Sequence, residues 1–300
     1  MAVKKKSSPK DTDKKSKIKK KPPTLQEKEE LLNLDLPDEM SEPATNIEDY
    51  NMMIFGPKGI GKTSLASRFN NSLTMAFEPG GKALRTYQRA VPNWIHFRKY
   101  IAMLSEDPGK FTTVVIDTAQ IAYNRCMDYA CEEAGISHPS EGAYGAGWKR
   151  VAQEFERQMN SLMSIGMGIV AVAHDKDDEV ETKSGRKFNK MIPALTGQCD
   201  EYFSGPIDVV GYYHYDGEQR WLQIRGSDYV TAKCRLEENF IAKDGQPVFK
   251  IPMGTTPDEA YSNLVRAFNN KQEDSYIPDA IKTKVKAAEG RRPKKKKRAR

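Results

Sequence analysis

The sequence predicts an α/β fold in which a mostly parallel central sheet is flanked by helices and ends in an antiparallel hairpin. Three observations support this prediction. Short apolar, β-branched segments alternate with longer segments of helical periodicity from residue 49 onward. Two such segments, 51–55 and 64–69, are joined by a glycine-rich turn. Further on, Asp216-Gly217 separates two apolar segments, a pattern typical of a tight hairpin.

The predicted elements follow in chain order. We expect strands at 51–55, 72–77, 112–116 and 168–173, with a short additional strand at Trp94–Ile95. Helices are expected at 64–69, 97–104, 121–134 and from Trp148 to Leu162. The glycine-rich segment 135–147 and the polar segment 175–191 are predicted to be loops. Val209–Tyr215 and Trp221–Arg225 form the hairpin, and the capping box Thr256-Pro257-Asp258-Glu259 begins a helix that ends near Phe268.

Charge is unevenly distributed along the 300 residues. Residues 1–21 carry ten lysines and a formal charge of +8, while residues 282–300 carry eleven lysines or arginines and +10. Subtracting both from the overall +7 leaves −11 for residues 22–281. The sequence therefore predicts an acidic folded body with basic tails that contact polyanions. The final basic run also matches a nuclear import signal, and composition does not separate the two interpretations.

These shifts in composition define four predicted regions. Residues 1–48 form a disordered segment that is lysine-rich and then acidic, and 49–255 form the folded core. Residues 256–281 form a C-terminal helical extension, and 282–300 form a disordered basic tail. The four cysteines include no C-x-x-C pair, which favours reduced thiols in a cytoplasmic protein. The longest apolar run, 166–173, is too short to cross a membrane.

The turn after the first strand matches the phosphate-binding pattern G-x-x-x-x-G-K-[ST]. It reads Gly56-Pro57-Lys58-Gly59-Ile60-Gly61-Lys62-Thr63 and is followed by Ser64. Glycines allow backbone N–H groups to approach phosphate oxygens, because no Cβ stands in the way. Lys62 adds a positive charge for the terminal phosphates, and the Thr63 hydroxyl is a ligand for Mg²⁺. The sequence therefore predicts that ATP and Mg²⁺ bind here.

Three polar residues follow predicted parallel strands, at the edge where such sheets bind ligands. Asp117 ends an apolar strand, a pattern typical of a carboxylate that holds Mg²⁺, although a strand-ending Asp also caps ordinary turns. Glu78 is placed to activate a water beside the terminal phosphate, or is a solvated turn residue. His174 is placed to contact the terminal phosphate, or is an unligated strand-end histidine.

The polar segment 175–191 holds a group of cations among acidic residues. They are Lys176, Lys183, Arg186, Lys187 and Lys190. Clustered cations on a loop suit a phosphodiester backbone. A solvated surface loop explains the same composition equally well, so both interpretations stay open here.

The order of these features resembles the RecA/Rad51 recombinase core, and more closely the compact phage ATPases of the Sak group of single-strand annealing proteins. The matching stretches are 54–64, 77–81, 113–118 and 172–176, and the resemblance covers roughly Tyr50 to Arg235. It implies a RecA-like P-loop NTPase core, and an ATP- and Mg²⁺-dependent ATPase that binds single-stranded DNA and promotes annealing or recombination in the cytoplasm of a phage-infected cell.

The resemblance also implies roles for particular residues. Lys62 and Glu78 would be catalytic, Thr63 and Asp117 would hold Mg²⁺, and His174 would stand where recombinases place a phosphate-sensing glutamine. Segments 135–147 and 175–191 would face DNA. Three residues would act on a neighbouring subunit's nucleotide in a homo-oligomer, namely Arg225, Lys233 and Arg235. A single-strand-binding protein is a further expected partner. The main alternative is an ATP-driven motor or remodelling ATPase that acts on protein partners.

Overall fold

The computed structural model describes residues 36–181, 185 and 187–278. Most of the predicted N-terminal segment, the whole basic tail 282–300, and Lys183 and Arg186 therefore lie outside the described residues. From Ala44 onward the described residues form one compact unit. Within the described part of the chain, no helix is both long and apolar enough to span a bilayer.

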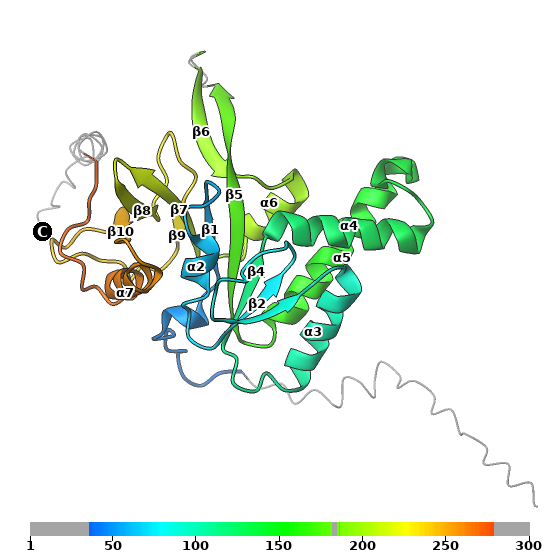
Figure 1. The fold of residues 1–300 in the computed structure, drawn as a ribbon, viewed down its shortest axis with the longest axis horizontal. Helices are drawn as coiled ribbons and strands as arrows, with labels where there is room; N and C mark the ends of the chain where they lie inside the picture. Colours follow the sequence, from blue (N-terminus) through cyan, green and yellow to red (C-terminus); the bar gives the residue numbers. More distant parts are fainter. Residues whose placement is uncertain (1–35, 182–184, 186, 279–300) are drawn as a thin grey trace, which may run out of the picture. The chain divides into compact units, whose positions relative to one another are not determined.

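A mostly parallel sheet forms the centre of the fold (Figure 1). Its strands lie in the order β10-β8-β7-β1-β5-β4-β2-β3, and every neighbouring pair from β7 to β3 is parallel. The parallel strands are β7 (Val209–Asp216), β1 (Met52–Gly56), β5 (Gly168–Glu181), β4 (Thr113–Asp117), β2 (Ser72–Ala76) and β3 (Tyr87–Ala90). The antiparallel strands are β8 (Gln219–Gln223), β10 (Lys250–Pro252), β9 (Lys233–Cys234) and β6 (Lys187–Pro193).

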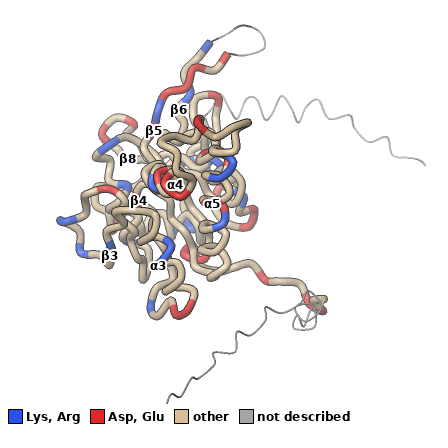
Figure 2. The backbone as a smooth tube through the Cα atoms, turned by 90° about the vertical axis from the view of Figure 1, so that its right-hand side faces the viewer, with Lys and Arg blue, Asp and Glu red and all other residues tan. Residues whose placement is uncertain are grey.

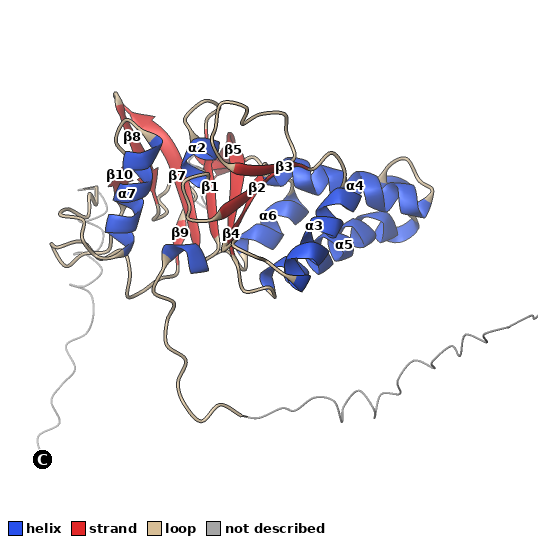
Figure 3. Ribbon diagram, turned by 60° about the horizontal axis from the view of Figure 1, so that its bottom comes forward, coloured by secondary structure: helices blue, strands red, loops and turns tan. Residues whose placement is uncertain are grey.

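Helices cover both faces of this sheet, because successive apolar side chains of each strand point to opposite sides. In β4, Val114 and Ile116 pack into one hydrophobic core and Val115 packs into the other. The first core includes α3 (Trp94–Glu106), α4 (Ala119–Ala134), α5 (Ala146–Met163) and α6 (Gly197–Ser204). The second includes α2 (Lys62–Ala66) and α7 (Pro257–Phe268). Figure 3 shows α7 and the α3–α6 group on opposite sides of the strands. The predicted fold class, an α/β P-loop NTPase core, is confirmed.

The prediction of a strand at Trp94–Ile95 was wrong. Asn93 caps a helix there, since its side chain accepts a hydrogen bond from the backbone N–H of His96. Trp94 is fully buried and stacks near Phe97 and Phe155, so it begins α3. The third strand lies earlier, at β3, where exposed side chains conceal the strand pattern.

The prediction that 175–191 is a loop was also wrong. β5 continues from the sheet as far as Glu181 and pairs antiparallel with β6. In this pairing Asp175 lies opposite Pro193, and Glu181 lies opposite Lys187. These strands form a two-stranded ribbon, here named the β5–β6 hairpin, which extends beyond the sheet (Figure 1). The predicted loop at 135–147 contains the short 3₁₀ helices η2 (Pro139–Glu141) and η3 (Ala143–Gly145) and the first residues of α5. A third 3₁₀ helix, η1 (Ile47–Asp49), precedes β1.

Two local predictions near the C-terminus are confirmed. β7 and β8 form the expected antiparallel hairpin. The Thr256 side chain accepts a hydrogen bond from the backbone N–H of Glu259, and the Glu259 carboxylate accepts one from the backbone N–H of Thr256. This capping box, with Pro257 in the first turn, begins α7.

Candidate functional site

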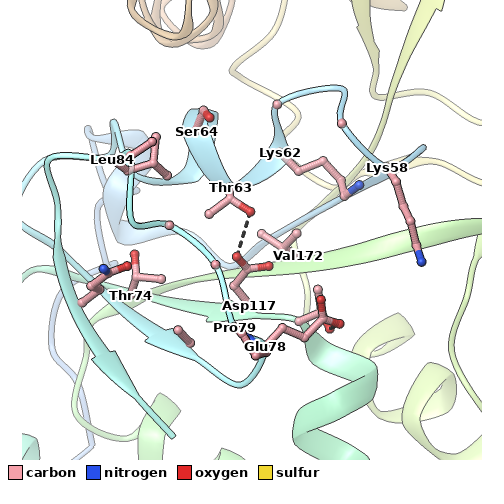
Figure 4. A pocket seen from close by; sticks show the side chains of 18 of the residues that line it. Lys58, Lys62, Thr63, Ser64, Thr74, Glu78, Pro79, Leu84, Asp117 and Val172 are labelled. Carbon is pink, nitrogen blue, oxygen red and sulfur yellow. Dashed lines mark hydrogen bonds between the residues drawn. The ribbon is translucent and has the colours of Figure 1, made fainter.

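The parallel register brings the predicted site residues to one edge of the sheet. Gly56 pairs with His174 across β1 and β5, and Ala76 pairs with Asp117 across β2 and β4. Glu78 follows β2 at the same edge. Glu78, Asp117 and His174 border a pocket of about 750 Å³, shown in Figure 4. Its lining includes Lys58, Gly59, Gly61, Lys62, Thr63, Ser64, Glu78, Pro79, Ala83, Leu84, Asp117 and His174.

The phosphate loop needs its glycines for two different reasons. A Cβ on Gly56 would lie 2.0 Å from the backbone oxygen of Tyr213 in β7, so a side chain there would separate the strands. Gly59 and Gly61 have φ angles of +82° and +105°, in the left-handed region that side-chain-bearing residues avoid. The backbone between them is therefore free to turn its N–H groups inward.

Lys62 lies buried at the base of this loop. Its ammonium donates hydrogen bonds of 2.8 Å to the carbonyl oxygens of Gly56 and Pro57. Burial lowers the pKa of Lys62, an effect that the negative charge of Asp175 opposes. The side chain thus holds a partly desolvated cation beside the pocket, and such a cation attracts phosphate more strongly than a hydrated one.

Thr63 and Asp117 connect the phosphate loop to β4. The Thr63 hydroxyl donates a 2.7 Å hydrogen bond to Asp117 Oδ2, drawn as a dashed line in Figure 4. Burial raises the pKa of the Asp117 carboxyl, while this hydrogen bond and the charge of Lys62 oppose the rise. A hydroxyl beside a carboxylate is the kind of oxygen pair that Mg²⁺ prefers. Among the described residues, no cluster of three or more His, Cys, Asp or Glu side chains could hold a metal alone. A cation here would therefore be shared with a phosphate ligand.

Glu78 follows β2, and its carboxylate lies near residues of two other strand ends, Thr118 after β4 and His174 in β5. Its Oε1 accepts a 2.8 Å hydrogen bond from the Thr118 hydroxyl and lies 4.0 Å from His174 Nε2. Burial, with the nearby charge of Lys62, lowers the pKa of His174. The imidazole is therefore neutral at neutral pH, and its contact with Glu78 is not an ion pair there. Within the described structure, His174 Nδ1 is buried without a hydrogen-bond partner.

Of the five predicted nucleic-acid residues, the three that the structure describes lie on the β5–β6 hairpin. Lys176 donates a hydrogen bond to the backbone oxygen of Leu195, and Lys187 forms a 2.8 Å ion pair with Glu179. Lys190 lies on β6. The described part of the hairpin also carries five carboxylates, at Asp175, Asp177, Asp178, Glu179 and Glu181. Figure 2 shows acidic and basic residues on the same two strands.

The residues predicted to act on a neighbour lie at the opposite end of β7 from the pocket. Lys233, in β9, pairs with Val210 near the start of β7, whereas the strand reaches the pocket edge at Tyr212 and Tyr213. Arg225 donates a hydrogen bond to the backbone oxygen of Cys234, and Arg235 lies just after β9. None of these three lines this chain's own pocket. Their role at a neighbouring subunit stays a prediction.

Sequence reasoning missed two residues near the phosphate loop. Thr118, whose hydroxyl contacts Glu78, could have been found because it directly follows Asp117. Arg220 had no local signal, because it reaches the loop through the pairing of β7 with β8. Its Nη1 lies 3.5 Å from the position of a Cβ on Gly61, and its Nε donates a hydrogen bond to the backbone oxygen of Gly254.

A phosphate loop, a hydroxyl–carboxylate pair and a mostly parallel sheet together define a P-loop NTPase core. Residues 48–236 match the family described as an AAA domain, and the chain therefore belongs to that family. Membership implies nucleotide binding.

Two individual proteins are also similar to this chain. The SPbeta prophage-derived uncharacterized protein YorG of Bacillus subtilis (strain 168) is 25% identical over 158 residues, which cover 51% of this chain and 48% of that protein. The chain thus aligns with about half the length of this relative. The crystal structure of the KaiC-like protein PH0186 from Pyrococcus horikoshii OT3 is 13% identical, with a TM-score of 0.39, over 70% of this chain and 88% of that one.

Proposed function

We propose that this protein is an ATP- and Mg²⁺-dependent ATPase that binds single-stranded DNA and promotes its annealing or recombination in phage DNA metabolism. One observation carries the nucleotide part of this proposal. A single pocket is bordered by side chains from three different strand ends. They are Lys62, the hydrogen-bonded pair Thr63 and Asp117, and Glu78. Such a set supplies a phosphate cradle, oxygen ligands for a cation and a base for hydrolysis.

The proposed mechanism assigns a task to each side chain. The glycine-rich backbone and the Lys62 ammonium bind the β- and γ-phosphates. Thr63 and Asp117 hold Mg²⁺, which when bound neutralises charge on the transferred phosphoryl group. Glu78 orients a water and accepts its proton, and its position beside neutral His174 leaves it free of an ion pair that would weaken it as a base.

We propose that the pocket and the β5–β6 hairpin communicate through β5, and chain connectivity supports this. β5 passes through His174 and continues directly into the hairpin. The backbone N–H of Ala194, just after β6, donates a 2.7 Å hydrogen bond to the backbone oxygen of His174. In our proposal, contact between His174 and the terminal phosphate changes the hairpin's orientation, and hydrolysis reverses it.

DNA binding is proposed mainly for the basic tails, assisted by the hairpin. The tails carry ten lysines in 1–21 and eleven lysines or arginines in 282–300, a charge density that suits a phosphodiester backbone. The prophage source of the related YorG protein is consistent with phage DNA metabolism. We further propose that the protein acts as a homo-oligomer in the cytoplasm of the infected cell, with Arg225, Lys233 and Arg235 completing a neighbour's site, and that a single-strand-binding protein is a partner.

The acidic hairpin favours a second candidate function. Its five carboxylates outnumber Lys176, Lys187 and Lys190, the lysines on the described part of its strands, and acidic side chains repel DNA. A motor or remodelling ATPase that acts on a basic protein partner would use such a surface directly.

One experiment separates these functions. ATP turnover and fluorescence anisotropy of labelled single-stranded DNA would be measured with the full chain, at about 50 and 200 mM salt, with and without a non-hydrolysable ATP analogue. DNA-stimulated turnover and nucleotide-dependent DNA binding would support the first function. Turnover that DNA leaves unchanged, with no DNA binding at either salt concentration, would favour the second. A chain that fails to bind nucleotide at all would contradict both.

A further inference from the structure

We propose that Thr118 is a positioning residue for Glu78, so that its hydroxyl determines which carboxylate oxygen receives the proton of the attacking water. This inference rests on the proposed function, since it concerns the same hydrolytic site. It begins from a 2.8 Å hydrogen bond that joins two strand ends, from Thr118 Oγ1 after β4 to Glu78 Oε1 after β2. The donor is buried, with 4% of its surface exposed, whereas the Glu78 side chain is 40% exposed.

The position of Thr118 in the helix makes this bond informative. Thr118 is the N-cap residue of α4, and a threonine at an N-cap usually accepts a hydrogen bond from a backbone N–H of the first turn. Here no such capping bond forms. The hydroxyl is directed across to Glu78 instead, so its orientation serves the carboxylate rather than the helix.

Glu78 depends on this contact for its orientation. It precedes Pro79-Gly80-Gly81, a turn that supplies little side-chain packing. Among the described residues, Thr118 is the hydrogen-bond donor that the structure gives Glu78, and His174 is its other polar neighbour, 4.0 Å from the same Oε1. Without the hydroxyl, the glutamate would sample several staggered rotamers.

The contact also distinguishes the two oxygens of the carboxylate. Oε1 is engaged by Thr118 and faces His174, so Oε2 is left to accept a proton. A base held in one orientation reacts faster than one that must first be oriented, because the cost of ordering has already been met in the folded state. We therefore expect Thr118 to affect turnover rather than nucleotide binding.

The test compares Thr118→Val, Thr118→Ser and wild type in the full chain. Val keeps the branched shape and removes the hydroxyl, while Ser keeps the hydroxyl. General acid–base catalysis contributes about 10²–10⁴-fold, so losing the orientation of the base should lower kcat by about tenfold in Thr118→Val. The Kd for an ATP analogue with Mg²⁺ should change less than about threefold, and Thr118→Ser should restore most of kcat. Thr113→Val is the matched control, because Thr113 is a fully buried residue at the far end of β4.

A double variant excludes a merely structural effect. In a Glu78→Gln background the base is already absent, so adding Thr118→Val should leave the residual turnover unchanged. If Thr118→Val does not fold, as judged by circular dichroism, Thr118→Ala makes the same comparison. Suppose that the wild-type protein hydrolyses ATP and that the variant without the hydroxyl has a kcat within about twofold of the wild-type value. That result would overturn this inference but not the proposed function. So would equal losses of kcat and binding, or an additive double variant. A wild-type chain that binds ATP without hydrolysing it would overturn the proposed hydrolysis as well.

Discussion

The hydroxyl of Thr63 donates a 2.7 Å hydrogen bond to the carboxylate of Asp117, although 53 residues of chain lie between them. This bond joins the start of α2 to the end of β4 and marks where a cation would enter. Asp117 is half-buried, and burial raises the pKa of its carboxyl although Thr63 and Lys62 oppose the rise, so its charge is not fully compensated. A divalent cation would supply that compensation.

Asp117→Asn should therefore uncouple nucleotide binding from Mg²⁺. The amide keeps the shape of the side chain but removes the charge that attracts the cation. We expect the Kd for ATP measured with Mg²⁺ to rise by about tenfold, while the Kd measured with EDTA changes little. Isothermal titration calorimetry under both conditions checks this. Equal Mg²⁺ dependence in the variant and wild type would contradict the assignment.

Lys62→Ala should abolish nucleotide binding. The substitution removes the buried cation beside the pocket and frees the carbonyl oxygens of Gly56 and Pro57 that it now occupies. Lys58→Ala is the matched control, because Lys58 also lines the pocket but is exposed. Titration with a fluorescent ATP analogue should show loss of binding in Lys62→Ala and a smaller effect in Lys58→Ala. Similar affinities for the two variants would argue against a special role for Lys62.

Glu78→Gln should separate binding from turnover. The amide preserves the length of the side chain but cannot accept a proton as a base, so kcat should fall by about 10²-fold or more with little change in Kd. Release of inorganic phosphate and analogue binding measure the two quantities. A Glu78→Gln protein with normal turnover refutes the catalytic role.

Acidification should destabilise the protein through two half-buried histidines, His174 and His214. Burial lowers the pKa of both His174 and His214, so each binds a proton more readily in the unfolded state than in the folded one. The free energy of unfolding should therefore fall as pH decreases through about 6.5, the ordinary histidine value, and continue to fall until the folded-state pKa is passed. Thermal melts at pH 7.5 and 5.5 should show a smaller loss in a His174→Gln/His214→Gln variant. An identical loss would exclude these histidines as the cause.

Removal of residues 282–300 should weaken DNA binding and flatten its salt dependence. The deleted segment carries eleven basic residues, and each phosphate contact that is lost lowers the slope of log K against log salt by about 0.7 for single strands. The control replaces the segment with an uncharged glycine–serine segment of equal length. An unchanged slope in the deletion variant would show that the tail does not contact DNA.

The pocket could be predicted from sequence because parallel strands end at a common edge. Once 51–55, 72–77, 112–116 and 168–173 are identified as strands, the residues that follow them must meet. The β5–β6 hairpin could not be predicted in this way. Residues 175–181 read Asp-Lys-Asp-Asp-Glu-Val-Glu, and a ribbon solvated on both faces shows no apolar alternation. The position of Thr118 near the site follows from the same rule, because it comes directly after Asp117. Its hydrogen bond to Glu78 depends on the register of β2 against β4, which local patterns do not encode.

Because β5 is continuous, a rotation of the strand at His174, beside the pocket, would be carried into the β5–β6 hairpin. From His174 to Glu181 the strand rises about 3.3 Å per residue, which gives an arm of about 23 Å. A tilt of about 10° at His174 would then sweep the outer end through about 4 Å, more than one residue's rise along the strand. Under the proposed function, a small displacement at the terminal phosphate would therefore become a larger displacement at the outer end of the hairpin.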